Sequence, residues 1–312
     1  MSGHIVVKVS AIDTISPVVK QFTLEPCDRA LPRFSAGSHV VVSMPGQDRW
    51  YRNAYSLLGD PADTSCYRIA VRRQEASRGG SRFMHEDVAV GDHLSISPPS
   101  NFFLPRWNAR HHILIAGGIG ITPFLAYLHE FERQGASHEL HYSFREDTTG
   151  GFSLELQQRL GSSLHCYQGA RPDFHRILAD RPLGTHVYIC GPQGMIDAVT
   201  RAAKDMDWAD TRVHYEAFAA PESGTPFVAR LAASGIDVTV DDETSLLEAL
   251  EAQGVEVPNL CRGGVCGQCK TAVAEGRVEH RDAFLDDEER KRHDCIMPCV
   301  SRSLTDTLVL DL

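Results

Sequence analysis

The first hundred residues alternate short apolar runs with turn-forming residues. The apolar runs are rich in Val, Ile and Tyr, and they span residues 4–15, 18–24, 39–44, 67–72 and 93–97. Proline, glycine and aspartate interrupt them at 45–46, 59–61, 91–92 and 98–99. Short strands at this spacing are typical of a small antiparallel barrel or sandwich, which we predict for this part of the chain.

From about residue 105 to 218 the pattern changes to alternating strands and helices. Apolar runs at 113–116, 140–144 and 187–190 predict strands, and a helical pattern follows each of them. After the first run, Thr122 is the predicted N-cap residue and Pro123 the first helical residue, where a missing N–H is harmless. Alternation of this kind predicts an α/β domain with a parallel sheet.

A third region follows a segment of small and proline-containing residues. It has predicted strands at 227–231, 237–240 and 308–310 and one predicted helix. That helix begins at Ser245, whose spacing to Glu248 fits a capping box, and it ends at Gly254. We therefore expect domains at 1–103, 104–220 and 227–312, with a linker at 221–226.

Composition narrows the class of protein. A chain of 312 residues corresponds to two or three domains, and 42% hydrophobic residues argue against disorder as the main state. The net charge of −10 disfavours general nucleic-acid binding. Residues 226–312 carry 9 Lys and Arg against 17 Asp and Glu, so most of the negative charge lies there. This excess is either a solvated surface or a docking face for a basic partner.

No segment of the sequence indicates a membrane or an export route. The longest mainly apolar stretch, 113–128, is too short and too rich in glycine and proline to span a bilayer, and no signal peptide is visible. We expect a cytoplasmic protein that acts without a membrane. In that compartment nine cysteines do not form a disulfide framework.

Five of the cysteines gather near the end of the chain. Cys261, Cys266 and Cys269 have C-x4-C-x2-C spacing and Cys299 follows later, which is the pattern of plant-type [2Fe–2S] ferredoxins. The intervening glycines 263, 264 and 267 let a loop fold around a cluster and direct N–H groups at its sulfurs. A zinc site or buried structural thiols are the alternatives, and Cys295 competes with Cys299 as the fourth ligand.

The other cysteines have no such pattern. We expect Cys27, Cys66 and Cys166 to be small buried hydrophobic residues.

Two glycine-containing turns each follow a predicted strand and open a predicted helix. Their sequences are AGGIGITP (116–123) and CGPQGM (190–195). Glycine allows a pyrophosphate to approach closely, and a helix N-terminus supplies N–H donors. At the ends of parallel strands the two turns would lie side by side across one crevice, where nucleotides bind. The first turn does not fit G-x-G-x-x-G, so taken alone it is equally a structural turn.

The choice of nucleotide depends on the end of the strand at 140–144. Glu146 and Asp147 follow it, and an acidic residue there accepts hydrogen bonds from a ribose 2′-OH and repels a 2′-phosphate. Asp147 therefore favours NADH, while Arg145 argues for NADPH.

Two motifs in the β region suit a flavin. Tyr55 could lie flat on a ring, and Ser56 could donate a hydrogen bond to a ring nitrogen. Residues 77–81, with two glycines and flanking arginines, suit a phosphate. Taken alone, an aromatic residue in a strand usually belongs to the core, and a segment such as 77–81 is usually only a polar turn.

In this order, the motifs resemble the ferredoxin–NADP⁺ reductase superfamily and, within it, the phthalate dioxygenase reductase family. The resemblance covers essentially the whole chain and rests on AGGIGITP, CGPQGM, HYEAF (214–218), CRGGVCGQCK (261–270) and MPCVSR (297–302). It implies an FMN-binding antiparallel β-barrel, an NADH-binding α/β domain with a parallel sheet, and a β-grasp-like plant-type ferredoxin domain. It also implies that Cys299 is the fourth cluster ligand, with Cys261, Cys266 and Cys269.

The resemblance assigns roles to residues of the barrel. Tyr55 would contact the isoalloxazine and Ser56 its N5 atom, and the turn of Gly79, Gly80 and Ser81 would bind the FMN phosphate. Arg52 stands three residues before Tyr55, where the family has its arginine two before. The phosphate role would therefore be shared with Arg73 or Arg78.

The resemblance also assigns residues to the nucleotide. Gly118, Gly120 and Thr122 would bind the pyrophosphate, and Cys190, Gly191 and Pro192 would lie beside the nicotinamide. Phe218 would cover the flavin. Ser56, Cys190 and Phe218 are then the residues expected at the reacting rings.

The function implied is a redox relay. NADH gives a hydride to the flavin, and electrons pass singly through the cluster to a Rieske-type oxygenase. The protein would be a monomer, and none of its 15 histidines is predicted to be catalytic. The alternatives are a similar reductase for another acceptor, such as a haem monooxygenase, and a non-enzymatic iron–sulfur sensor.

Overall fold

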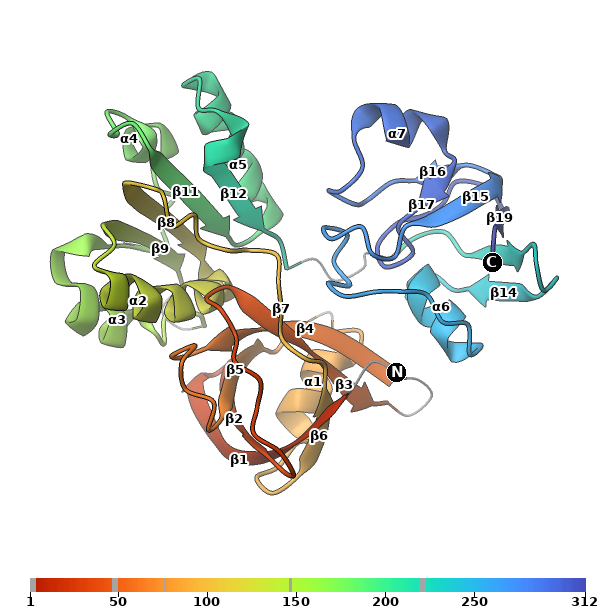
Figure 1. Ribbon diagram of the computed structural model, residues 1–312, viewed down its shortest axis with the longest axis horizontal. Helices are drawn as coiled ribbons and strands as arrows, with labels where there is room; N and C mark the ends of the chain where they lie inside the picture. Colours follow the sequence, from red (N-terminus) through yellow and green to blue (C-terminus); the bar gives the residue numbers. More distant parts are fainter. Residues whose placement is uncertain (1–3, 47–49, 76, 146–147, 219–222) are drawn as a thin grey trace. The chain divides into compact units, whose positions relative to one another are not determined.

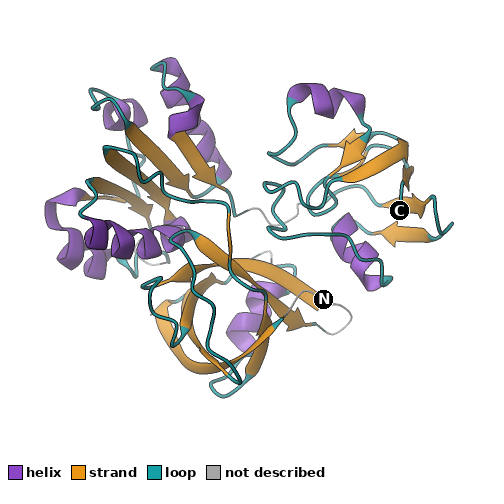
Figure 2. Ribbon diagram, in the orientation of Figure 1, coloured by secondary structure: helices purple, strands orange, loops and turns teal. Residues whose placement is uncertain are grey.

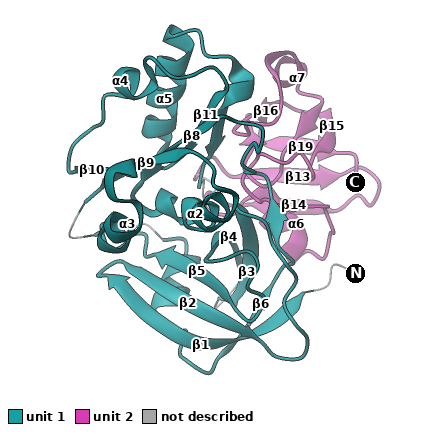
Figure 3. Ribbon diagram, turned by 60° about the vertical axis from the view of Figure 1, so that its left-hand side comes forward, with its two compact units in different colours: residues 1–218 teal, residues 219–312 magenta. Residues whose placement is uncertain are grey.

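A computed structural model describes residues 4–46, 50–75, 77–145, 148–218 and 223–312. The chain divides into two compact units, residues 1–218 and 219–312 (Figure 3). The first unit holds an antiparallel barrel and a parallel sheet, and the second holds a smaller mixed sheet (Figures 1 and 2). Among the helices of the described residues, none has the length and apolar character that crossing a membrane requires.

The N-terminal region is the predicted antiparallel barrel. Its strands are β1 (Ile5–Ser16), β2 (Val19–Pro26), β3 (Ser38–Pro45), β4 (Trp50–Leu58), β5 (Tyr67–Arg72), β6 (His93–Ile96) and β7 (Ser100–Asn101). They pair in the order β4-β5-β2-β1-β6-β3-β7, and an additional pairing of β3 with β4 closes the barrel. Ile5, Val7 and Val9 are buried while Val6 and Lys8 are exposed, as expected for a strand with one face on the core. The helix α1 (Gly80–Glu86) packs against β4 and β5.

The second region is the predicted parallel sheet. Its strands are β8 (His111–Gly117), β9 (His138–Phe144), β10 (Leu164–Gln168), β11 (Thr185–Cys190) and β12 (Val213–Glu216), in the order β10-β9-β8-β11-β12. The helices α2 (Thr122–Gln134) and α3 (Ser153–Leu160) cover one face, and α4 (Phe174–Leu178) and α5 (Gln193–Asp205) cover the other. Three short 3-10 turns complete it: η1 (Gly118–Ile121), η2 (Gly161–Ser163) and η3 (Asp210–Arg212).

Helix α2 packs against both the barrel and the sheet. Leu125 and Tyr127 of α2 share one hydrophobic cluster with Leu58 of β4 and Leu114 of β8. The buried hydroxyl of Tyr127 donates a hydrogen bond of 2.5 Å to the carbonyl of Phe103. The barrel and the sheet therefore share a continuous core through α2, which explains why they form one compact unit (Figure 3).

The predicted N-cap of α2 is wrong. Thr122 has helical backbone angles, and its hydroxyl donates to the carbonyl of Ile119 at 2.9 Å instead of capping an N–H group. The reason is η1, which runs directly into α2 and makes Ile121 the N-cap residue.

In the second unit, the described residues 223–312 form strands and helices around the cysteine segments. They are β13 (Phe227–Leu231), β14 (Asp237–Val240), α6 (Leu246–Ala252), β15 (Thr271–Glu275), β16 (Val278–Glu279), α7 (Asp287–Arg292), β17 (Cys295–Ile296), β18 (Arg302–Ser303) and β19 (Thr307–Leu310). The main sheet has the order β14-β13-β19-β15-β17, and β16 pairs with β18. The capping box of Ser245 and Glu248 at the start of α6 is confirmed.

Helix α7 contradicts the prediction of one helix in this region. Its residues DEERKR are all charged, so no apolar periodicity reveals it. Asp286 and Glu289 form a capping box, with acidic residues in the first turn and basic residues in the last. Capping and favourable interaction with the helix dipole stabilise it.

The predicted burial of three cysteines is also wrong. Cys27 and Cys166 are exposed, and Cys66 is partly exposed. Cys27 follows the last residue of β2, and Cys166 lies on β10, which is the edge strand of its sheet. Positions at strand ends and sheet edges leave a side chain in water whatever its apolar character.

The fold predicts a loss of stability in acid. His112 on β8 is 1% exposed, packs against Phe131 and Tyr188, and burial lowers its pKa from 6.5 to about 4. Between these values the unfolded chain binds a proton that the folded chain does not. The contribution of His112 to the free energy of unfolding is therefore constant above about pH 6.5. It falls by about 1 kcal/mol per pH unit as the pH is lowered from there toward 4.

Replacement of His112 by Phe retains a stacking ring and removes the titration. The urea midpoint of this variant is expected to fall less between pH 7 and pH 5 than that of the wild type. The same substitution at His93, which is exposed on β6, is the control. Equal pH dependence in wild type and His112→Phe would contradict the assignment.

Candidate functional site

Four cysteine thiols lie in two pairs in the second unit. Cys261, Cys269 and Cys299 are buried, and Cys266 is partly exposed. The sulfurs of Cys269 and Cys299 are 3.4 Å apart. A hydrogen bond from the Cys266 thiol, with further ones from backbone N–H groups, lowers the pKa of Cys261 to about 5. Each iron of a [2Fe–2S] cluster needs two thiolates, so this donor set fits the cluster.

The loop around these thiols has the backbone that the glycines were expected to allow. Gly264 and Gly267 have φ angles of 74° and 73°. A Cβ on Gly267 would lie 2.3 Å from the ring of Phe284, so no side chain fits there. The backbone N–H of Gly263 donates to the sulfur of Cys261 at 3.4 Å. The cluster loop, residues 261–269, thus directs at least one backbone donor to a ligand sulfur.

Sequence reasoning missed the residue that anchors this loop. Arg262 is 8% exposed and has a positive φ of 51°. Its guanidinium donates two hydrogen bonds to the carboxylate of Glu251 on α6, at 2.7 and 2.8 Å. A two-pronged contact of this kind is geometrically specific and holds a strained backbone in place. Arginine between two cysteines was visible in the sequence, but its partner eleven residues away was not.

Cys295 occupies a different environment. It lies on β17 opposite Ala272 of β15, and burial raises the pKa of its thiol. Its polar neighbours are Asp294 and Lys270. The environment of Cys295, on a strand and beside charged residues, therefore differs from that of the four paired thiols.

The two glycine turns meet at the ends of adjacent strands, as the sequence predicts. β8 and β11 are parallel neighbours, with Ala116 opposite Cys190. A Cβ on Gly120 would lie 2.2 Å from the carbonyl oxygen of Cys190, and one on Gly191 would lie 3.0 Å from the Cα of Gly117. The backbones are thus in direct contact. Glycine lets the two turns lie against each other at the carboxyl ends of the strands, which is where nucleotides bind in open α/β sheets.

The other residues predicted to bind the nucleotide lie on different elements, and two of them lie outside the described residues. Gly118 lies in η1 with a φ of 55°, and Pro192 is the N-cap residue of α5. Phe218 is 43% exposed just after β12. Asp147, on which the preference for NADH depends, lies outside the described residues, as does Glu146.

The predicted flavin residues cluster on β4. Ser56 is 4% exposed, and its hydroxyl has no hydrogen-bond partner among the described residues. Burial raises the pKa of Tyr55 to about 12, and its hydroxyl accepts a hydrogen bond of 3.2 Å from the amide of Asn53. A buried hydroxyl without a partner is costly, so an absent polar group of a ligand is the natural partner of Ser56.

The predicted phosphate turn opens helix α1. Gly79 has a φ of 129°, and a Cβ on it would lie 2.2 Å from Tyr51. The hydroxyl of Ser81 donates to that of Ser77 at 2.9 Å. Small residues and hydroxyls therefore line this turn, which fits a phosphate.

The arginines near this turn differ in their partners. The guanidinium of Arg73 is 2.5 Å from the carboxylate of Glu86, so a phosphate would have to displace this ion pair. Arg52 lies on β4 opposite Ser43, and Arg78 directly precedes Gly79. The sharing of the phosphate role among them stays a prediction.

His39 is a further residue that sequence reasoning missed. It lies on β3 directly opposite Ser56 and is 5% exposed. Its Nε2 atom has no hydrogen-bond partner among the described residues, and burial lowers its pKa to about 4. A neutral imidazole therefore stands beside the hydroxyl of Ser56. Only strand register could have revealed this neighbour.

A barrel, a nucleotide-type α/β sheet and a four-thiol site on one chain define an iron–sulfur oxidoreductase. Residues 230–304 match the family described as 2Fe-2S iron-sulfur cluster binding domain. Residues 94–213 match the dimethylamine monooxygenase subunit DmmA-like N-terminal domain.

Two related proteins align with this chain over essentially its whole length. The heme-dependent oxidative N-demethylase beta subunit of Ectopseudomonas mendocina is 52% identical over 100% of both chains. The phthalate 4,5-dioxygenase oxygenase reductase subunit of Pseudomonas putida is 38% identical over 99% of this chain and 97% of its own.

A solved structure of phthalate dioxygenase reductase has a TM-score of 0.87 and 34% identity, and covers 99% of this chain and 98% of its own. That protein is described as a modular structure for electron transfer from pyridine nucleotides to [2Fe-2S]. The chain belongs to the phthalate dioxygenase reductase family of oxygenase reductase components. The predicted family, fold class and oxidoreductase activity are thereby confirmed.

The fourth cluster ligand is testable by a matched pair of variants. Cys299→Ser is expected to abolish stable cluster binding, because it removes one thiolate of the Cys269–Cys299 pair. Cys295→Ser is expected to retain the cluster. Iron and acid-labile sulfide per chain, with visible absorbance, distinguish them. Loss of the cluster in Cys295→Ser and retention in Cys299→Ser would reverse the assignment.

Proposed function

We propose that this protein passes electrons from NADH through FMN to its [2Fe–2S] cluster and then, one at a time, to an oxygenase. The observation that carries the proposal is the unpartnered buried hydroxyl of Ser56 in the same compact unit as the two contacting glycine turns. One unit thus offers sites for a flavin and a dinucleotide, and the chain adds four paired thiols. Two-electron and one-electron carriers on one chain suit a relay.

The proposed residue roles are those that the family resemblance assigns to residues of the first unit. Ser56 would donate a hydrogen bond to flavin N5, with Tyr55 against the ring system and Phe218 covering it. Gly118, Gly120 and Thr122 would bind the nucleotide pyrophosphate, and Cys190, Gly191 and Pro192 would border the nicotinamide. Hydride transfer to a flavin needs no acid–base residue, and the pKa of His39, lowered to about 4 by burial, keeps this neighbour uncharged near neutral pH.

FMN and NADH are the proposed cofactor forms. FMN is supported by the family resemblance and by the compact turn at Gly79, Gly80 and Ser81, where the phosphate would bind. NADH is supported by the acidic residues after β9, among them Asp147. A monomer is proposed because the residues assigned to each cofactor all lie on one chain.

The proposed acceptor is an oxygenase of one of two classes. The family resemblance supports a Rieske-type oxygenase. A haem-dependent oxygenase is the second candidate, and the relative from Ectopseudomonas mendocina, a subunit of a heme-dependent oxidative N-demethylase, favours it. The substrate would be bound by the acceptor and not by this chain.

An anaerobic NADH titration tests the relay. We expect flavin and iron–sulfur absorbance to bleach together, with an end point at about 1.5 NADH per chain because FMN takes two electrons and the cluster one. Chromatography of the released flavin identifies FMN or FAD. Bleaching by NADPH but not by NADH would contradict the role of Asp147, and bleaching of flavin alone would contradict the relay.

Reconstitution with purified acceptors tests the class of oxygenase. The reductase is expected to support NADH-dependent turnover of its own oxygenase at least tenfold faster than turnover of an oxygenase of the other class. Rates with one Rieske-type and one haem-dependent oxygenase are compared at equal cluster content. Failure with both classes, while a dye is still reduced, would reject an oxygenase as acceptor.

A further inference from the structure

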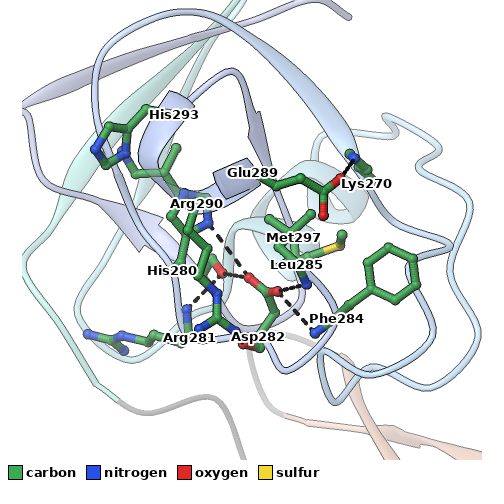
Figure 4. A network of polar contacts seen from close by, with 12 residues as sticks. Lys270, His280, Arg281, Asp282, Phe284, Leu285, Glu289, Arg290, His293 and Met297 are labelled. Carbon is green, nitrogen blue, oxygen red and sulfur yellow. Dashed lines mark hydrogen bonds and ion pairs between the residues drawn. The ribbon is translucent and has the colours of Figure 1, made fainter. Parts of the chain in front are cut away.

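The carboxylate of Asp282 lies at the centre of a buried network in the second unit (Figure 4). Asp282 follows β16 and is 5% exposed. Its Oδ2 atom accepts hydrogen bonds from the backbone N–H groups of Leu285 at 2.8 Å and Phe284 at 3.2 Å. Its Oδ1 atom accepts one from the hydroxyl of Ser301 at 3.2 Å. Both oxygens act as acceptors, which is the behaviour of an ionised carboxylate.

The Asp282 segment connects the cluster loop to the segment that carries Cys299. Ala283 donates its N–H to the carbonyl of Gly264 at 3.0 Å. A Cβ on Gly264 would lie 3.1 Å from the Cα of Asp282, so the two backbones are in close contact. On the other side, Ser301 stands two residues after Cys299 and accepts the N–H of Arg281 at 3.1 Å.

The neighbouring arginines make contacts with groups other than this carboxylate, whose hydrogen bonds come from two backbone N–H groups and a hydroxyl. Arg290 donates to the backbone carbonyl of Asp282 (Figure 4), and Arg281 pairs with Glu279 at 2.9 Å. His280 has its Nδ1 atom 3.7 Å from Oδ1, but its side chain is only 6% exposed and stacks on His293. Burial lowers the pKa of His280, so the ring is neutral near pH 7. The carboxylate of Asp282 is thus buried and held by neutral hydrogen-bond donors, while the guanidinium of Arg290 contacts the backbone of the same residue.

We propose that Asp282 is a positioning residue of the [2Fe–2S] site and that its charge lowers the reduction potential of the cluster. The carboxylate holds the two cysteine-bearing segments together through Ser301 and the 282–285 backbone. Reduction adds one electron to a centre whose ligands lie on the two segments that this carboxylate joins, and repulsion by the buried charge disfavours that step. The inference rests only on the cluster-binding part of the proposed function.

Asp282→Asn tests the charge, because asparagine keeps the shape of the side chain. Full-length protein is titrated with dithionite and mediators, and the reduced cluster is quantified by electron paramagnetic resonance. The equilibrium constant for one-electron reduction is expected to rise about tenfold, which corresponds to about 59 mV. Asp286→Asn is the matched control. Asp286 caps α7 from an exposed position, where asparagine caps equally well and water screens the lost charge.

Ser301→Ala tests the positioning role separately, since it removes the hydroxyl link and retains the charge. We expect a chelator to remove its iron at least threefold faster than from the wild type, with a reduction constant within about twofold of the wild-type value. A reduction constant of Asp282→Asn equal to that of Asp286→Asn would overturn the electrostatic role. If Asp282→Asn retains no cluster, unchanged iron loss in Ser301→Ala would overturn the proposal, and faster loss would support it.

These measurements need neither NADH nor an oxygenase. A failed NADH titration would therefore leave the role of Asp282 standing, and an unchanged potential would leave the proposed electron transfer standing.

Discussion

The contact between the glycine backbones at the ends of β8 and β11 is the constraint on which the first unit depends. A Cβ at Gly120 would overlap the carbonyl of Cys190, and one at Gly117 would lie 2.7 Å from the ring of Pro192. Because β8 continues through η1 into α2, this contact also sets where α2 begins. Helix α2 in turn packs against β4, the strand that carries Tyr55 and Ser56. The position of α2 therefore relates the glycine turns to the predicted flavin residues.

Most of the fold could be predicted because its elements carry local signals. The strand β1 of the barrel begins with alternating buried and exposed residues, and the strand 227–231 was predicted with the bounds that it has. Helix α7 could not be predicted from periodicity, since only capping and charge order stabilise it. The N-cap at Thr122 failed for another reason, which is that a 3-10 turn replaced the extended residue that a cap requires.

The candidate site likewise has parts that could be predicted from the sequence and parts that could not. The cysteine spacing and the glycine turns are contiguous in sequence, and the structure brings their members together. The contacts that support them are not contiguous: Arg262 with Glu251, His39 with Ser56, and Asp282 with Ser301. Such pairs depend on strand register and loop packing, which no window of sequence contains. The class of oxygenase that accepts the electrons could not be predicted from this sequence either, because it depends on the surface of another protein.

The anchoring of Arg262 to Glu251 has a consequence for how the metal centre is built. The two hydrogen bonds from Arg262 to Glu251 tie the cluster loop to helix α6, which carries none of the ligand cysteines. The positions of Cys261 and Cys266 on either side of the bend then depend on how α6 packs. A substitution on α6 that shifts Glu251 would affect the metal centre although it touches no thiol.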